Sequence, residues 1–289
     1  MRIMVTGASG YLGQVIQRVL AREHEVAAYG HRQVAAHRQP LDLREAAAVT
    51  AAVERLQPDA VVHCAAYRDP DFCEQHPAEA WRLNVESARA LLASLPAAAR
   101  FLFISSDYVF DGVHPPYPED GERHPINYYG RTKVAAEDLV LARGNGIVLR
   151  VPLLVGPGPR FQQSGFIAKA AQTIEEQAVS EWDDVIQRFP TAIDDVAAAV
   201  AFLLEREDTA GIYHFSQRTG GTQYAWVQRL ADIMGVPRAR LQPARSLVAR
   251  PARRPVNSQL ANRRLAALGF DRQTDFETVA RQVLATRCP

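Results

Sequence analysis

The chain has 289 residues, and its 33 Lys and Arg against 32 Asp and Glu give a formal net charge of +1. This balance excludes a broadly basic nucleic-acid-binding surface and an acidic disordered chain as first interpretations. Three cysteines, Cys64, Cys73 and Cys288, form no Cys-x-x-Cys pair, which argues against a disulfide scaffold or a thiolate zinc site and favours the cytoplasm. No apolar run approaches the roughly 18 residues of a membrane span, so we expect no membrane partner.

Short apolar runs alternate with longer amphipathic runs through the first part of the chain. In order, the pattern predicts strand 2–6, helix 11–21, strand 25–29, helix 42–56, strand 60–64, helix 78–95, strand 100–105, helix 129–142 and strand 147–151. Asp42, with Glu45 three residues on, is expected to cap the second helix. Near-continuous apolar strands alternating with helices indicate a doubly wound α/β (Rossmann) fold with a parallel sheet.

After the Gly-Pro-Gly-Pro run at 156–159 the pattern changes. A helix is expected at 166–177, and helix 194–204 with strand 212–216 is expected to return to the sheet. We therefore expect an NAD(P)-binding lobe of residues 1–155 plus about 191–216. A smaller, mostly C-terminal substrate-binding lobe would comprise about 156–190 plus 217–289.

A glycine-rich turn joins the first strand to the first helix. Gly7, Gly10 and Gly13 have the spacing G-x-x-G-x-x-G. Such glycines allow a tight turn and close approach to a pyrophosphate, and the helix start adds unpaired N–H groups. We predict a dinucleotide site here, and we count Ser9, Tyr11 and Leu12 among its contacts.

The second strand ends at His31-Arg32, without the acidic residue that holds the ribose of NAD. Arg32 would pair with a 2′-phosphate, so we expect NADP(H) to be preferred and NAD(H) to be possible. A solvated loop arginine is the alternative. The other cofactor contacts predicted from strand ends are His31, Asp42, Leu43, Cys64, Ala65, Ala66, Tyr67, Ser105 and Val151.

Tyr129 and Lys133 lie four residues apart on one predicted helix and so share a face. A neighbouring ammonium favours the phenolate and lowers the pKa of a tyrosine, which suits proton transfer at a carbonyl group. Ser106, at the end of the fourth strand, lies at the edge of the sheet where ligands bind. Tyr129 and Lys133 are also predicted to contact the cofactor.

These runs, with Ile104-Ser-Ser-Asp-Tyr-Val-Phe-Asp-Gly112 and Arg254-Pro-Val-Asn-Ser258, resemble the extended short-chain dehydrogenase/reductase superfamily and its dTDP-4-dehydrorhamnose reductase group. The resemblance implies an NADPH-dependent reductase of a keto group on a nucleotide-activated deoxysugar. Ser106 stands where the group usually has threonine. The resemblance assigns catalysis to Ser106, Tyr129 and Lys133, cofactor contact to Asn84, and substrate contact to Tyr108 and Phe110.

Two other runs, 62–71 and 187–191, are similar to the regulatory β-subunit branch of the methionine adenosyltransferases. This branch implies NADP binding and regulation of a partner adenosyltransferase. Because it largely keeps the three catalytic residues, they do not separate the two readings.

The region 238–264 holds eight arginines and no acidic residue. Such a block is commonly a solvated or interface surface. It could also clamp the diphosphate of a nucleotide-sugar, and for this role we single out Arg254, together with Arg188. No nucleic-acid-binding module is present, so we expect no nucleic-acid partner. We expect a small-molecule substrate, with a homodimer as a possible assembly.

Overall fold

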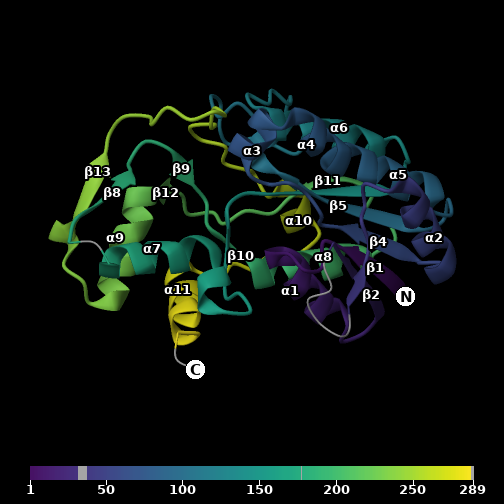
Figure 1. Ribbon diagram of the computed structural model, residues 1–289, viewed down its shortest axis with the longest axis horizontal. Coiled ribbons are helices and arrows are strands. Elements are labelled where there is room, and N and C mark those ends of the chain that lie inside the picture. Colours follow the sequence, from purple (N-terminus) through teal and green to yellow (C-terminus); the bar gives the residue numbers. More distant parts are fainter. Residues whose placement is uncertain (32–37, 177, 288–289) are drawn as a thin grey trace.

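The computed structural model describes residues 1–31, 38–176 and 178–287. Its larger lobe is built on a seven-stranded parallel sheet with the order β11-β6-β5-β4-β1-β2-β3 (Figure 1). The order reverses between β1 and β4, which creates the crevice where doubly wound sheets bind ligands. The predicted α/β fold is confirmed. The strands are β1 Arg2–Thr6, β2 Glu25–Gly30, β3 Arg38–Pro40, β4 Ala60–His63, β5 Arg100–Ser106, β6 Gly146–Val151 and β11 Gly211–His214.

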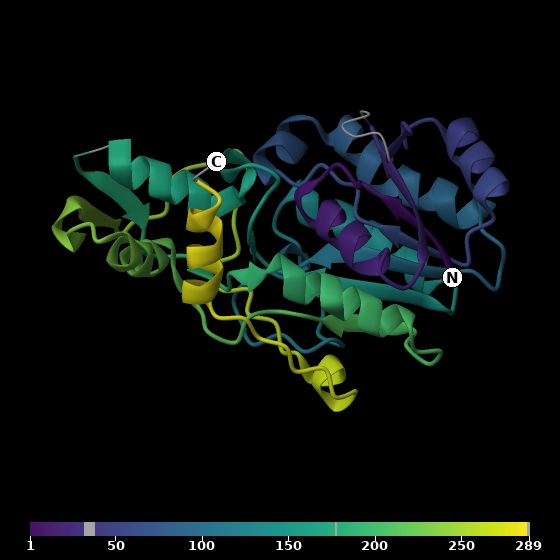
Figure 2. The ribbon, with the colours of Figure 1, turned by 90° about the horizontal axis from the view of Figure 1, so that it is seen from below.

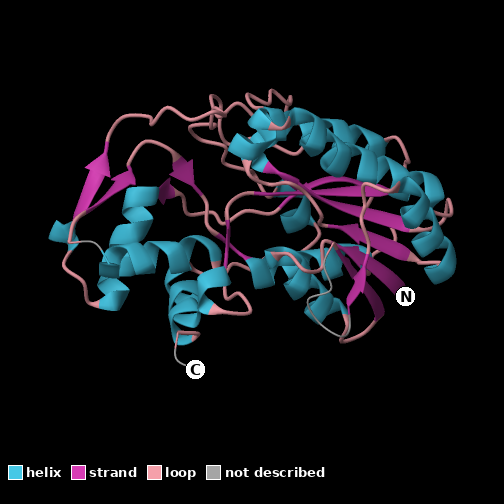
Figure 3. Cartoon of the chain, in the orientation of Figure 1, coloured by secondary structure: helices cyan, strands magenta, loops and turns pink. Residues whose placement is uncertain are grey.

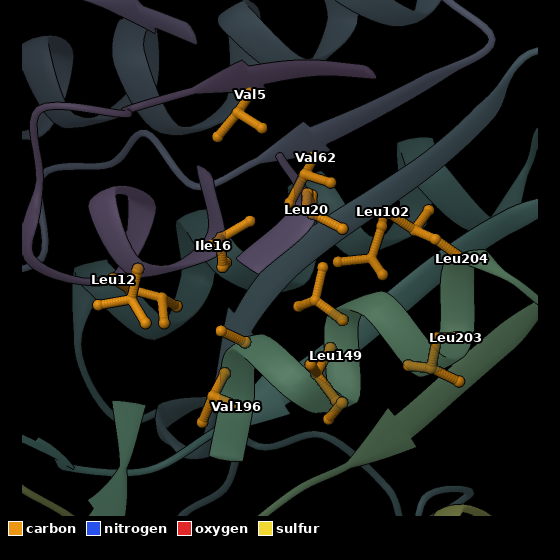
Figure 4. Packing of buried hydrophobic residues seen from close by; sticks show 14 of the residues in the cluster. Val5, Leu12, Ile16, Leu20, Val62, Leu102, Leu149, Val196, Leu203 and Leu204 are labelled. Atoms are coloured by element: carbon orange, nitrogen blue, oxygen red, sulfur yellow. The ribbon is translucent and has the colours of Figure 1, made fainter. Parts of the chain in front are cut away.

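Helices cover both faces of this sheet (Figure 3). On one face α1 (Tyr11–Leu20) and α8 (Ile193–Leu204) lie side by side, as Figure 2 shows. Leu12, Ile16 and Leu20 recur every fourth residue on α1 and are buried against the sheet and α8 (Figure 4). The opposite face is covered by α2 (Ala46–Leu56), α5 (Ser87–Ser94) and α6 (Tyr128–Leu141).

Two details of the helices differ from the sequence prediction. Asp42 does not cap α2, because its carboxylate binds the backbone N–H and guanidinium of Arg44, and the helix begins later, at Ala46. The helix expected at 78–95 comprises α4 (Pro77–Trp81), a π-helical turn at Arg82–Glu86 and α5, and it follows an unpredicted short helix, α3 (Pro70–Gln75). The π turn carries Asn84.

The smaller lobe has its own apolar core, which α7 (Gly165–Glu176), α9 (Gln223–Met234) and α11 (Phe276–Ala285) enclose (Figure 1). Three two-stranded sheets surround it, and α10 (Arg263–Ala267) returns to pack beside β11. In the part of the chain that the structure describes, no helix is long and apolar enough to cross a membrane. The sheets pair β7 Leu154–Val155 with β10 Thr191–Ala192, β8 Ser180–Asp183 with β13 Leu241–Ala244, and β9 Gln187–Arg188 with β12 Gly221–Thr222.

Candidate active site

A cavity of about 560 Å³ lies at the carboxyl edge of the sheet, and residues of both lobes line it. Most of the predicted site residues meet there: Gly7, Ser9, Gly10, Tyr11, Leu12, Gly13, His31, Asp42, Leu43, Cys64, Ala65, Ala66, Tyr67, Ser105, Ser106, Tyr108, Tyr129, Lys133, Val151 and Arg188. Asn84, Phe110 and Arg254 are not among the lining residues. The predicted contact Arg32 lies outside the described residues.

The glycine turn forms one wall of the cavity and depends on the absence of side chains. Gly7 has φ +68°, and a Cβ there would lie 2.7 Å from the backbone nitrogen of Ala65. A Cβ on Gly13 would lie 2.3 Å from the carbonyl oxygen of Gly7. The turn therefore exposes backbone N–H groups at the start of α1, which is the arrangement that binds a pyrophosphate.

At the other end of the cavity, α6 places Tyr129 and Lys133 on one face. The helix starts where the side chain of Asn127 accepts a hydrogen bond of 2.9 Å from the Gly130 N–H. Lys133 is buried; its Nζ donates to the Ile104 carbonyl at 2.7 Å and lies 3.9 Å from the centre of the Phe103 ring. Lys133 and Tyr129 thus share the cavity wall, as their spacing predicts.

Burial dominates the electrostatics of both groups. It lowers the pKa of Lys133 to about 7, because an ammonium loses hydration there. Burial also raises the pKa of Tyr129, and the Ser106 hydroxyl opposes that rise by favouring the phenolate. From the sequence, Lys133 is expected to lower the pKa of Tyr129; in the structure, burial and the Ser106 hydroxyl are the larger influences on that pKa.

The two serines at the end of β5 face different partners, because neighbouring side chains on a strand point to opposite faces. Ser105 Oγ donates to Glu137 at 2.5 Å, so its hydroxyl is engaged away from a ligand. Ser106 Oγ donates to Asp107 at 3.0 Å and accepts from the Tyr108 N–H at 3.2 Å. Of the two hydroxyls, that of Ser106 is therefore the better placed to meet a carbonyl oxygen.

Behind Ser105 lies a fully buried ion pair that the sequence analysis missed. Arg150 donates from Nε and Nη2 to the two carboxylate oxygens of Glu137, at 2.9 and 2.7 Å. Asp107 was also missed as a site residue: it lines the cavity, accepts from Ser258 at 2.5 Å, and burial raises its pKa. Of these missed residues, Asp107 could have been found from the sequence, because it directly follows the predicted site residues Ser105 and Ser106.

The two predicted anion-binding arginines have different surroundings. Arg188 lines the cavity beside Tyr108, and its buried Nη1 has no hydrogen-bond acceptor among the residues that the structure describes. Arg254 instead forms a two-pronged ion pair with Asp71 of α3, at 3.0 and 2.9 Å, outside the cavity. Both arginines were expected in one clamp, but Arg254 is paired with Asp71, 183 positions away, and only Arg188 lines the cavity.

The other two predicted residues outside the cavity have structural contacts. Asn84 holds the loop after β4 in place. Its side-chain oxygen accepts a hydrogen bond from the Tyr67 N–H at 2.8 Å, and its side-chain nitrogen donates to the Tyr67 carbonyl at 3.0 Å and to the Thr132 hydroxyl. Phe110 is fully buried and stacks on Tyr117 with ring centres 4.1 Å apart. Both residues therefore support the walls of the cavity from behind.

Comparison with known proteins identifies the fold family. The family model described as "RmlD substrate binding domain" matches residues 1–288. The chain belongs to this family. The resemblance to the dTDP-4-dehydrorhamnose reductase group is thereby confirmed.

The chain is similar to proteins of two kinds. It is 34% identical to methionine adenosyltransferase 2 subunit beta of Bos taurus, over 95% of this chain and 84% of that protein. It is 36% identical to dTDP-4-dehydrorhamnose reductase of Streptomyces griseus, over 93% of this chain and 88% of that protein. Among solved structures, a dTDP-4-dehydrorhamnose reductase from Clostridium acetobutylicum superimposes with a TM-score of 0.87, 25% identity and 99% coverage of both chains. RMD from Pseudomonas aeruginosa complexed with NADPH gives a TM-score of 0.81 and 27% identity, covering 99% of this chain and 98% of that one.

Proposed function

We propose that this protein is an NADPH-dependent reductase of a keto group on a nucleotide-activated deoxysugar, similar to dTDP-4-dehydrorhamnose reductase. The observation that carries the proposal is one cavity that has a glycine turn at one end and Ser106, Tyr129 and Lys133 at the other. The relative from Streptomyces griseus supports the substrate class.

The lining residues fit a dinucleotide. At Gly7 and Gly13 a Cβ would collide with the backbone, and the cavity continues from this turn to Tyr129. Gly7, Gly10 and Gly13 would hold the pyrophosphate, Asp42 and Leu43 the adenosine, and Lys133 the nicotinamide ribose. The related RMD structure contains NADPH. When bound, NADPH supplies the hydride for the substrate carbonyl carbon.

The protein's own residues would handle the proton and orient the substrate. Tyr129 gives its phenolic proton to the substrate's carbonyl oxygen, which becomes an alcohol. Ser106 would turn its hydroxyl proton from Asp107 to the same oxygen and so hold that oxygen within reach of the tyrosine. Lys133, when charged, stabilises the phenolate left on Tyr129.

Arg188 gives the site a preference for an anionic substrate. Its buried Nη1 lacks an acceptor within the described ranges. Burying a charged donor without an acceptor costs free energy, and a bound ligand that supplies the acceptor removes this cost. A nucleotide-sugar diphosphate has the charge and the oxygen geometry for such a guanidinium.

The decisive experiment measures NADPH oxidation with dTDP-4-dehydrorhamnose. Tyr129→Phe should lose nearly all turnover and keep its NADPH affinity, because the hydroxyl acts on the substrate. Tyr128→Phe is the matched control, since Tyr128 is the neighbouring helix residue but does not line the cavity. Full turnover by Tyr129→Phe, or none by the wild type, would contradict the proposal.

A second candidate is an NADP-binding regulatory subunit of a methionine adenosyltransferase. The identity of 34% to the Bos taurus β subunit over nearly the whole chain favours it. Calorimetry with dTDP and UDP on the NADP-loaded protein separates the two. Binding heat supports the reductase; no heat from either nucleotide, with co-elution of an adenosyltransferase, supports the regulatory subunit.

A further inference from the structure

The part of the cavity next to the end of β2 contains a charged pair that the sequence did not reveal. β3 runs parallel to β2 with Gly30 beside Pro40, and the Leu41 N–H donates to the Gly30 carbonyl at 2.8 Å. This pairing brings Asp42 next to His31: the carboxylate Oδ2 lies 3.8 Å from the imidazole Nδ1. An acidic residue therefore does lie beside the end of β2, and it comes from the segment that follows β3.

Arg44 neutralises this carboxylate. Its Nε and Nη2 donate to Oδ1 and Oδ2 of Asp42 at 2.9 and 2.7 Å, and its backbone N–H adds a bond of 3.0 Å. Both side chains are about 30% exposed and both line the cavity. The hydrogen bonds from Arg44 lower the pKa of Asp42 to about 2, so the pair is ionised and has no net charge at neutral pH.

A free carboxylate at this end of a doubly wound fold would accept a hydrogen bond from a ribose hydroxyl and repel a phosphate. Pairing with a guanidinium removes both effects, because the fork occupies the carboxylate oxygens and cancels their charge.

We propose that Arg44 determines cofactor choice by masking Asp42, so that the ribose end of the cavity accepts a 2′-phosphate. This inference rests on the dinucleotide site of the proposed function, and it uses only residues that the structure describes. Arg44 acts here through Asp42 and is a specificity residue without a part in the proton transfer.

The test measures binding alone, with NADPH and NADH titrated against the full-length protein by fluorescence. Arg44→Met keeps the aliphatic stem and removes the charge, so it should weaken NADPH binding about tenfold relative to NADH, the cost expected for an unmasked carboxylate near a phosphate. Adding Asp42→Asn to Arg44→Met should restore most of that loss, because the repelling charge is gone.

The matched control is Arg89→Met, which removes an equivalent charge from an exposed pair with Glu86 that does not line the cavity. It should leave the ratio of the two affinities unchanged. NADH affinity reports whether each variant is folded; if Arg44→Met loses both cofactors, Arg44→Gln takes its place in the same scheme.

Two outcomes would overturn the proposal. An unchanged NADPH-to-NADH ratio in Arg44→Met and Arg44→Gln would show that the pair does not govern the choice. A double variant as weak for NADPH as Arg44→Met would show that the guanidinium contacts the phosphate directly and does not act through Asp42. Since no sugar substrate is used, a failed reductase assay would leave these results intact.

Discussion

Replacing Lys133 by methionine should change how the stability of the cofactor-free protein depends on pH. Lys133 is 2% exposed, and burial lowers its pKa to about 7 from the 10.5 of a free lysine. Between these two values the unfolded chain binds a proton that the folded protein does not. The free energy of unfolding therefore rises with pH across this window, and the cost of burying the charge is fully present below about pH 7.

The expected size follows from linkage, which gives about 1.4 kcal/mol per pH unit for one proton. Between about pH 7.5 and about pH 9, the wild type should gain about 2 kcal/mol of stability relative to Lys133→Met. The lost hydrogen bond to Ile104 and the lost contact with Phe103 are a nearly constant offset, so the difference between the two pH values isolates the charge.

Urea unfolding without cofactor at both pH values provides the measurement. Lys169, the only other lysine in the sequence, is exposed on α7, so Lys169→Met is the matched control and should show no such pH dependence. An equal pH dependence in the wild type and Lys133→Met would refute the reasoning, because Lys133 would then keep its ordinary pKa in the folded protein.

Three further changes test other parts of the structure. Gly13→Ala should abolish NADPH binding in a fluorescence titration, because the new Cβ would collide with the glycine turn. Arg188→Ala should weaken dTDP binding by about 1.5–3 kcal/mol in calorimetry, whereas Arg254→Ala, outside the cavity, should hardly affect it; equal losses would contradict the assignment. Arg150→Met should lower the free energy of unfolding in urea by about 3–5 kcal/mol, since it leaves Glu137 charged and buried, and combining it with Glu137→Leu should recover part of the loss.

Much of the larger lobe could be predicted because its signals are local. Apolar residues recur with the spacing of strands and of amphipathic helices along this part of the chain. The turn at Gly7–Gly13 and the pair Tyr129 and Lys133 each occupy one short stretch of sequence. Gly7, Gly10, Gly13, Tyr129 and Lys133 all line the cavity.

The features that were missed depend on contacts between distant parts of the chain or on very short elements. The strands of the smaller lobe have two to four residues, too few for a period to be recognised. Arg254 and Asp71 are 183 positions apart, so nothing near Arg254 shows that it is already paired. The Asp42 case is different: its partner Arg44 is only two positions away, but the sequence alone does not show that Asp42 binds this guanidinium and leaves the start of α2 uncapped.

The return of the chain to the sheet has a consequence for the order in which the protein folds. Val196 and Val200 of α8 complete the core beside Ile16, and β11 pairs with β6 at the edge of the sheet, yet these segments follow α7 and several strands of the smaller lobe in sequence. During synthesis the first 155 residues therefore emerge with an apolar face of the sheet uncovered and with β6 unpaired on one side. Neither lobe corresponds to a contiguous fragment, so a truncation after β7 should aggregate and should not yield an isolated cofactor-binding domain. The dominance of such long-range pairings also predicts slow folding for a chain of this size.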